Sequence, residues 1–507
     1  MSQQTLNQHK ISKGISLIIG FAGLAILLFA TLGTLSAEAL PWWLISTLLM
    51  AIGVIGYSWS RYNGQLPGIK NNKVWQMSLT SRGLWAWIWG AIITGFYILL
   101  YFYPRYLGLG ESGEPNSGLV ALFDPFSQLL KGQPASQWFV YGVLYTLAII
   151  VFGIKFLFKY RHNPYQKLRT FSVMFFQLGF AFLIPEFMLR LNLPYNDFKN
   201  MWPLNYYFFD EWNIRAMSDS GAIGLFMILF GIAMIFVISP ILTYYYGKRW
   251  YCSWVCGCGG LAETAGDPFR HLSDNSVTAW KIERWMIHSV LLFSFIMTAA
   301  VIYSYLNNDP SGFFVKKHWF IALLVTILLG LTLIMRWKPR FVGTLGTKEK
   351  KILTSVMVLL IALMLFSLFT GKSELFFIDA HKLRSTYGFL IGATFSGVIG
   401  VGFYPLMGSR VWCRFGCPMA AILGIQQKFF SRFRITTNGG QCISCGNCSV
   451  YCEMGIDVRA YAQKGQNIVR ASCVGCGICS AVCPRGVLRL ENGKIDLDNK
   501  IEFDYFT

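Results

Sequence analysis

Charged side chains are scarce in this 507-residue chain, since Asp, Glu, Lys and Arg make up 13% of it while 54% of the residues are hydrophobic. Soluble domains carry about 25% charged residues, so the composition excludes an ordinary soluble fold. Apolar runs long enough to cross a membrane recur along the chain. We expect a polytopic α-helical membrane protein with about ten spans of roughly 20 residues each, at 15–35, 42–60, 83–103, 138–158, 170–190, 221–244, 285–306, 319–335, 352–370 and 386–407.

Carboxylates are scarcer still: 24 Asp and Glu stand against 44 Lys and Arg, a formal charge of +20. The basic residues gather in alternate loops, as at Arg161, Lys167 and Arg169 and again at Lys248, Arg249 and Arg270. This alternation predicts that those loops and both termini face the cytoplasm, and it argues against a nucleic-acid surface. We therefore expect a multi-pass protein of a bacterial inner (cytoplasmic) membrane, with the lipid bilayer as a partner and no nucleic acid.

The chain changes character near residue 436, because no spanning run follows. Two segments, QCISCGNCSVYCEMGI and SCVGCGICSAVCPRGV, repeat the spacing C-x-x-C-x-x-C-x-x-x-C. In two-cluster bacterial ferredoxins three close cysteines hold one 4Fe-4S cluster and the fourth binds the other. The spacing predicts a small α+β domain with two such clusters, and it argues against zinc sites and disulfides. One cluster takes Cys442, Cys445, Cys448 and Cys483, and the other takes Cys473, Cys476, Cys479 and Cys452.

Two local details mark this C-terminal region. Glu453 follows Cys452 where the ferredoxin pattern usually has proline, which is expected to alter the surroundings of that cluster. The tail VLRLENGKIDLD, with Asn492-Gly493 at its centre, predicts a hairpin. The predicted organisation is an N-terminal transmembrane region of about five spans (1–220), a transmembrane region with two C-x-x-x-C motifs (221–418), an interfacial amphipathic helix or packed linker helix (419–437) and the ferredoxin-type domain (438–507).

Cysteines also stand at the ends of two predicted spans. GKRWYCSWVC (247–256) matches GSRVWCRFGC (408–417), which pairs Cys252 and Cys256 with Cys413 and Cys417. Positions i and i+4 share a face of a helix, so we expect each motif to present two thiols from one helical turn. Four readings fit: a third cluster or other metal, a Cu(I) site, a dithiol relay, or small buried residues. Cys258 adds a fifth thiol.

This arrangement of paired C-x-x-x-C motifs after membrane helices, followed by a two-cluster ferredoxin domain, resembles the membrane polyferredoxin family. Its members include the nitrous-oxide reductase maturation protein, the quinol-oxidising subunit of periplasmic nitrate reduction and the accessory protein of cbb-type oxidase assembly. Family members usually read C-x-x-x-C-P in both motifs. Cys417-Pro418 conforms, whereas Cys256-Gly257-Cys258 does not.

The resemblance implies an integral membrane electron-transfer protein or oxidoreductase subunit. Its partners would be a cytoplasmic redox protein and a membrane quinone or respiratory complex. The alternative is a factor that reduces copper and matures a respiratory enzyme, with Cys258 receiving the metal. A third hypothesis is a transporter with a redox-sensing domain. The sequence holds no carboxylate or nucleophile constellation typical of a hydrolase.

Overall fold

The computed structural model describes residues 3–32, 39–63, 83–111, 114–310, 312–313, 315–337 and 347–493. Within those residues, nine helices are long and apolar enough to cross a membrane. They are α1 (Gln3–Thr31), α2 (Ala39–Tyr62), α3 (Leu84–Phe102), α6 (Gln137–Lys159), the continuous run of α7 (Pro164–Phe175), η2 (Phe176–Leu183) and α8 (Ile184–Arg190), the run of α10 (Gly221–Ala233), η3 (Met234–Ile238) and α11 (Ser239–Tyr246), α14 (Val277–Asn308), α15 (Lys317–Trp337) and α16 (Thr347–Phe369).

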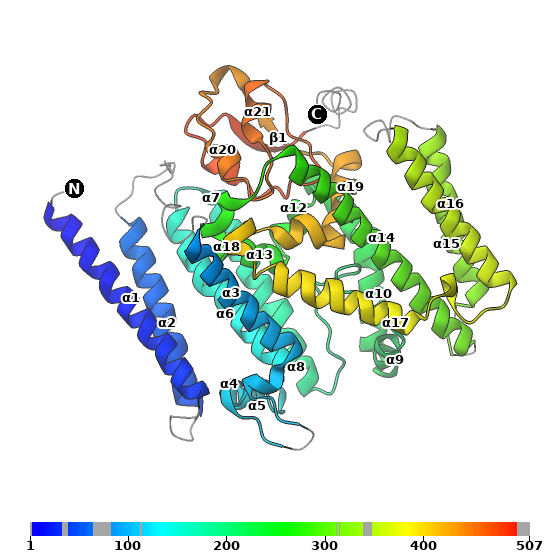
Figure 1. The fold of residues 1–507 in the computed structure, drawn as a ribbon, viewed down its shortest axis with the longest axis horizontal. Coiled ribbons are helices and arrows are strands. Elements are labelled where there is room, and N and C mark those ends of the chain that lie inside the picture. Colours follow the sequence, from blue (N-terminus) through cyan, green and yellow to red (C-terminus); the bar gives the residue numbers. More distant parts are fainter. Residues whose placement is uncertain are drawn as a thin grey trace.

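The long helices form a bundle with one helix pair at each side (Figure 1). At one side α1 packs on α2, where a Cβ atom on Gly53 would lie 2.6 Å from the Cα of Gly20. Small residues at such a crossing let helix backbones approach closely. At the other side α15 packs on α16 beside α14. The C-terminal domain sits on one end of the bundle, between these pairs, and α1 begins at that same end (Figure 1).

The predicted tenth span, 386–407, is not among the nine helices. Helical backbone there runs through α17 (Ala380–Tyr387) and the π-helical segment η7 (Gly388–Ile399), and a turn then leads into α18 (Tyr404–Met407). The neighbours leave no room for larger side chains in the turn, since a Cβ on Gly402 would lie 2.3 Å from Thr94 Oγ1. The segment is therefore divided by a turn at residues 400–403 where the sequence predicts one continuous helix.

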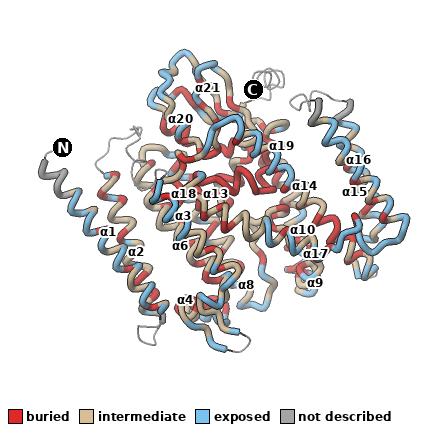
Figure 2. The backbone as a smooth tube through the Cα atoms, viewed as in Figure 1, coloured by how far each residue is buried: buried red, intermediate tan, exposed pale blue. Residues whose placement is uncertain are grey.

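Short helices fill the centre of the bundle beneath the C-terminal domain, and this is the most buried part of the molecule (Figure 2). Some of them follow α11 in the chain, and the others follow η7 and α18. The set comprises α12 (Arg249–Cys252), α13 (Gly257–Thr264), η4 (Asp267–Leu272), η8 (Trp412–Gly416) and α19 (Pro418–Phe430). At the far end of the bundle lie η1 (Pro104–Leu107), α4 (Gly118–Ala121), α5 (Asp124–Lys131), α9 (Glu211–Asp219) and η6 (Leu375–Phe377).

The C-terminal domain is built on a two-stranded antiparallel sheet. Strand β1 (Phe433–Thr437) pairs with β2 (Leu488–Asn492), with Ile435 opposite Leu490. Around the sheet lie η9 (Gly439–Gln441), α20 (Asn447–Val450), α21 (Val458–Gln463) and α22 (Ile478–Ala481).

Two sequence expectations change here. The linker helix ends at Phe430, and residues 433–437 form strand β1 instead. They do so because β2, which follows the cysteine repeats, pairs with this segment, which precedes them. One face of α19 is buried among α11 and α14, as a packed linker helix would be. The second arm of the predicted tail hairpin, from residue 494, lies outside the described residues.

One connection returns deep into the bundle. Residues 191–210, here named the return loop, start after α8 and lead into α9, both at the end of the bundle away from the C-terminal domain (Figure 1). Met201 in this loop is 4% exposed and belongs to the same packed cluster as Cys252 and Cys256. The loop thus extends from the far end of the bundle to Cys252 and Cys256. Together with Cys413 and Cys417 we call these residues the membrane-edge cysteines, and the motifs that carry them the membrane-edge motifs.

The bundle holds the C-terminal domain through four consecutive backbone carbonyls. Side-chain donors from the bundle reach each of residues 473–476: Gln427 to Cys473 (2.8 Å), Ser253 to Val474 (2.8 Å), Tyr165 to Gly475 (2.9 Å) and Gln166 to Cys476 (2.8 Å). Gln427 also donates to the carbonyl of Arg470 and accepts from the backbone N–H of Lys248, both at 2.8 Å. We call these four side chains the clamp.

We predict that Gln427→Leu loosens the domain from the bundle. The change leaves a buried N–H and two buried carbonyls without their partner, and each such group costs about 1–3 kcal/mol, so we expect a loss of at least about 3 kcal/mol. Thermal unfolding and protease release of the C-terminal domain measure it. The control is Gln463→Leu, which alters an exposed glutamine whose side chain donates a hydrogen bond to Ser444. Equal stability of the two variants would contradict the structural role of the clamp.

Candidate iron-sulfur sites and the buried charges between them

The two membrane-edge motifs have the same local construction. Each begins at a glycine with positive φ that ends the preceding helix, Gly247 at 66° and Gly408 at 94°. Only glycine adopts this conformation without strain, and there is no space for a side chain either, since a Cβ on Gly247 would lie 2.6 Å from Gln427 Oε1. A short helical turn follows, and it carries Cys252 in one motif and Cys413 in the other.

The second cysteine of each motif begins a new helix, which differs from the expected single turn. Cys256 is the residue before α13, and Cys417 holds the same place before α19. The free backbone N–H groups of each new helix point at the thiol: Ala420 donates to Cys417 Sγ at 3.4 Å, and Gly259 donates to Cys256. Helix N-termini favour a negatively charged ligand, so both positions suit a thiolate.

The four thiols lie together in the core. Cys252, Cys256, Cys413 and Cys417 are 6–7% exposed and belong to one packed cluster. Cys417 interacts electrostatically with each of the other three. Arg410 adds a donor, with Nη1 3.6 Å from Cys413 Sγ. Four converging soft ligands with N–H donors fit a 4Fe-4S cluster or a thiophilic metal.

Cys258 joins this group from the other side. It shares a hydrogen bond with Cys256, and this bond, then the charge of Lys199 and the N–H groups of α13, outweigh burial and lower the pKa of Cys256 below its usual value. The pKa of Cys258 is raised by the same bond and by burial. Cys256 is thus the thiolate of the pair, the form that binds metals.

Close packing explains why glycines replace the expected Cys-Pro. A Cβ on Gly257 would lie 2.5 Å from Gln177 Oε1 and 3.1 Å from Lys199 Nζ, and one on Gly260 would lie 2.2 Å from Val173. In the second motif Pro418 occupies the first position of α19, where proline is favoured. Glycine in place of proline in the first motif thus allows α13 to pack closely against α6, α7 and the return loop.

The ferredoxin-type cysteines form two groups in the predicted combination. Cys442, Cys445, Cys448 and Cys483 line one pocket at the surface, and Cys445 is exposed. In the other group, Cys479 interacts electrostatically with Cys476, Cys473 and Cys452. Cys473 and Cys476 of this second group lie in the clamped segment, which contacts the bundle beside Cys252. Both donor sets fit a 4Fe-4S cluster, whose ligands are four cysteine thiolates.

Buried charges fill the space between the clamped cysteines and the membrane-edge motifs. Glu453 forms ion pairs with Arg270 (3.0 Å) and with Arg410 (2.9 Å). Glu263 on α13 pairs with Arg410 at 2.5 Å and with Arg169 of α7. All five side chains are at most 3% exposed. Although burial raises it, the pKa of Glu453 lies below its usual value because Arg270 and Arg410 stabilise the carboxylate.

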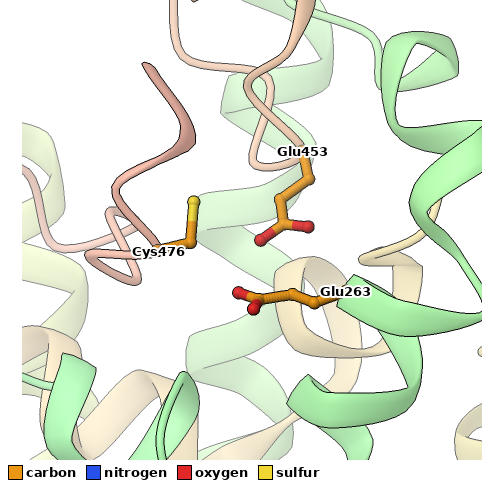
Figure 3. A group of neighbouring side chains, drawn as sticks. All are labelled: Glu263, Glu453 and Cys476. Carbon is orange, nitrogen blue, oxygen red and sulfur yellow. The ribbon is translucent and has the colours of Figure 1, made fainter. Parts of the chain in front are cut away.

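Two carboxylates and a thiol meet in this network. The ligand atoms of Glu263, Glu453 and Cys476 lie within 4.8 Å of one another (Figure 3). Each carboxylate already faces two guanidinium groups, and a cation placed among them would be repelled. The arrangement is a network of ion pairs beside a cluster ligand rather than a separate metal site.

Sequence reasoning missed several residues of this region. It noted Glu453 as a departure from proline without a partner, it took Arg169 as a basic residue of a cytoplasmic loop, and it passed over Glu263 and Lys199. The residues that Arg169, Glu263 and Lys199 contact lie far along the chain, so spacing held no signal for these contacts. Arg169 lies inside the helix Pro164–Arg190, and charged residues inside membrane segments are functional candidates by default.

Comparison with known proteins supports the iron-sulfur assignment. A family model described as a 4Fe-4S dicluster domain matches residues 441–488, and a model described as a 4Fe-4S binding domain matches twice, at 228–275 and 390–436. The second model thus covers both membrane-edge motifs. The chain therefore carries ferredoxin-type 4Fe-4S domains together with several helices able to span a membrane.

A relative among curated proteins points the same way. The protein named "Putative electron transport protein YccM" from Escherichia coli (strain K12) is 24% identical over 226 residues, which is 45% of this chain and 47% of that protein. The chain thus spans about half the length of the curated relative it matches. No solved structure matches the chain.

We predict that Glu453→Gln destabilises the protein. The variant leaves Arg270 and Arg410 without one of their buried partners, and breaking a buried ion pair costs about 3–5 kcal/mol. The midpoint of thermal unfolding measures the loss. Glu491→Gln, an exposed glutamate of the same domain, is the control, and a Glu453→Gln midpoint equal to that of Glu491→Gln would contradict the structural role of the network.

Proposed function

We propose that this chain is an integral membrane iron-sulfur protein that passes electrons between a cytoplasmic redox partner and a membrane quinone or respiratory partner. The observation that carries the proposal is the clamp. Ser253, the residue after Cys252, donates to the carbonyl of Val474 between Cys473 and Cys476, and Gln427 and Gln166 hold the carbonyls of Cys473 and Cys476. Such contact gives electrons a short covalent and hydrogen-bonded connection between the ferredoxin-type domain and the membrane-edge thiols.

The proposed ligand sets follow the two groups of cysteines. Cys442, Cys445, Cys448 and Cys483 hold one 4Fe-4S cluster, and Cys473, Cys476, Cys479 and Cys452 hold the second. Cys252, Cys256, Cys413 and Cys417 hold a third. The double match of the 4Fe-4S binding model to the two membrane-edge motifs supports the third site.

The first ligand set is the most exposed of the three, because it contains the exposed Cys445. In the second set Cys473 and Cys479 are 6–7% exposed and Cys452 and Cys476 are intermediate, and all four membrane-edge thiols are 6–7% exposed. When bound, 4Fe-4S clusters supply one-electron transfer without proton chemistry of their own. The chain's residues exclude water from the inner sites, and Arg270 and Arg410 supply positive charge next to the thiolates. Electrons thus enter or leave on the cytoplasmic side at the exposed end.

The return loop supports a quinone at the membrane end. Lys199 and Asp197 lie 3.8 Å apart, and Lys199 reaches the N-terminus of α13 next to Cys258. In the same place Gln177 has a buried amide oxygen without a hydrogen-bond partner. A quinone headgroup offers carbonyl oxygens, or hydroxyls when reduced, that match these donors and acceptors.

The charge pattern and the fold support the proposed orientation. The C-terminal domain lies at the end of the bundle where α1 begins (Figure 1), and the basic loops that contain Lys248, Arg249 and Arg270 lie there too. By the positive-inside rule this end faces the cytoplasm. The proposed location is a bacterial inner membrane with the ferredoxin-type domain inside.

Cys258 favours a second candidate function. A thiol that shares a hydrogen bond with Cys256, in a cluster of five cysteines, also suits a Cu(I) ion. In that case the chain would reduce and deliver copper to a respiratory enzyme, and the bound metal at the membrane edge would be cargo. Metal content separates the two candidates.

We predict about twelve iron atoms for each anaerobically purified chain, four for each cluster. Cys252→Ser and Cys413→Ser should each lower the count by about four, because each removes a ligand of the same site. Cys258→Ser is the matched control and should leave iron unchanged. About eight irons in the parent chain, with about one copper that Cys258→Ser removes, would instead favour copper handling.

We further predict that Lys199→Met slows reduction or oxidation of a soluble quinone analogue, because the headgroup loses a charged donor. Iron content and reduction by dithionite are measured on the same variant, because Lys199 also lowers the pKa of Cys256, and a loss of iron would assign the slower kinetics to the thiol site instead. Lys316→Met, an exposed lysine at the far end of the bundle, is the control. Equal quinone kinetics in the two variants would show that the return loop does not bind the quinone. The membrane acceptor would then be a protein partner.

A further inference from the structure

We propose that the rim around Cys445 is a docking surface for a soluble, acidic one-electron carrier protein. The inference rests on the proposed function and adds the chemistry of the cytoplasmic partner. The relevant surface consists of the pocket with Cys442, Cys445, Cys448 and Cys483 and the basic side chains around it. We call this surface the basic rim.

Two arginines stand directly at the pocket. Arg459 of α21 and Arg485 line it together with the four cysteines, and both are exposed. Arg459 Nη1 lies 3.8 Å from the point where a Cβ on Gly446 would sit, so its guanidinium group covers the cysteine loop. Lys464 and Arg489 add two further exposed cations in the same domain.

The described part of this domain carries little negative charge. Among the described residues from 438 to 493, Glu491 is the one exposed carboxylate. Glu453 is buried among arginines, and Asp457 accepts a hydrogen bond from Ser449 at 2.7 Å. Over residues 438–493 the solvent-facing surface is therefore positive, and its field attracts an acidic partner and speeds the encounter.

Apolar groups occupy the centre of the rim. Ile443 is 53% exposed, and Pro484 is exposed beside it at the pocket. An apolar centre within a charged edge is the usual anatomy of a transient protein interface. Because the centre coincides with the most exposed cysteine, a docked carrier would come closest to the chain where the first cluster is held.

The position of the rim favours a protein over the lipid surface. The domain projects from the end of the bundle, and α21, which carries Arg459, lies at its outer side (Figure 1). Anionic lipid headgroups are the competing ligand with the same chemistry. The experiment therefore includes them as a separate arm.

The test measures binding of an acidic flavodoxin to the full chain in nanodiscs of zwitterionic lipid. We expect Arg459→Glu combined with Arg485→Glu to weaken binding roughly tenfold or more. Raising the salt from about 0.05 M to about 0.5 M should weaken binding to the parent chain, since exposed charges are screened. Lys316→Glu at the opposite end of the bundle is the matched control and should bind as the parent does.

Three outcomes overturn the docking surface. They are equal affinity of the double variant and the control, affinity that does not depend on salt, and protection of Arg459 and Arg485 from a guanidinium-modifying reagent by anionic nanodiscs without flavodoxin, which would place the rim on the membrane. Iron content and reduction by dithionite are measured on every variant. Suppose that the chain binds flavodoxin with the expected dependence on salt and on Arg459 and Arg485 but holds no reducible cluster. That result would contradict the proposed function and would still support the docking surface.

Discussion

The carboxylate of Glu453 lies between the guanidinium groups of Arg270 and Arg410, and the rest of the site depends on this buried pairing. Arg410 belongs to the second membrane-edge motif, and Arg270 follows the first. Glu453 belongs to the ferredoxin-type domain. A single side chain thus joins the three parts that carry cysteines. Because a buried charge without its partner is strongly unfavourable, the network specifies how the domain sits on the bundle.

This pairing works together with the clamp. Ion pairs are long-range and tolerate small shifts, whereas four hydrogen bonds to consecutive carbonyls permit only one register. Guanidinium groups beside an iron-sulfur cluster favour its reduced form, because reduction adds a negative charge. Glu453 and Glu263 offset part of that effect. The residue that replaces the usual proline therefore both attaches the domain and adjusts the charge around the inner sites.

The sequence predicted which cysteines lie together better than it predicted their backbone. The repeat spacing placed Cys442, Cys445, Cys448 and Cys483 together, because ligand spacing reflects the shape of a cluster. The C-x-x-x-C pairs were expected on one helical face, but the second cysteine of each begins a new helix instead. Hydropathy found the nine regular spans and missed the turn after Ile399, where neighbours such as Thr94 leave no room for a side chain on Gly402.

The return loop and the charge network could not be read from the sequence. Lys199 and Asp197 look like ordinary loop residues, and their burial depends on how the chain folds back into the bundle. Glu263 and Arg169 meet only because α13 packs on α7. Contacts between residues so distant along the chain follow from packing, which local patterns do not encode.

The central claim is that the redox sites form a series from an exposed cluster to buried ones. Microwave power saturation of the reduced chain's EPR signals, with and without a water-soluble gadolinium complex, tests it most directly. The account predicts that the complex strongly relaxes the signal from the cluster held by Cys445 and leaves the signals of the inner sites nearly unchanged. Equal relaxation of all signals would contradict it.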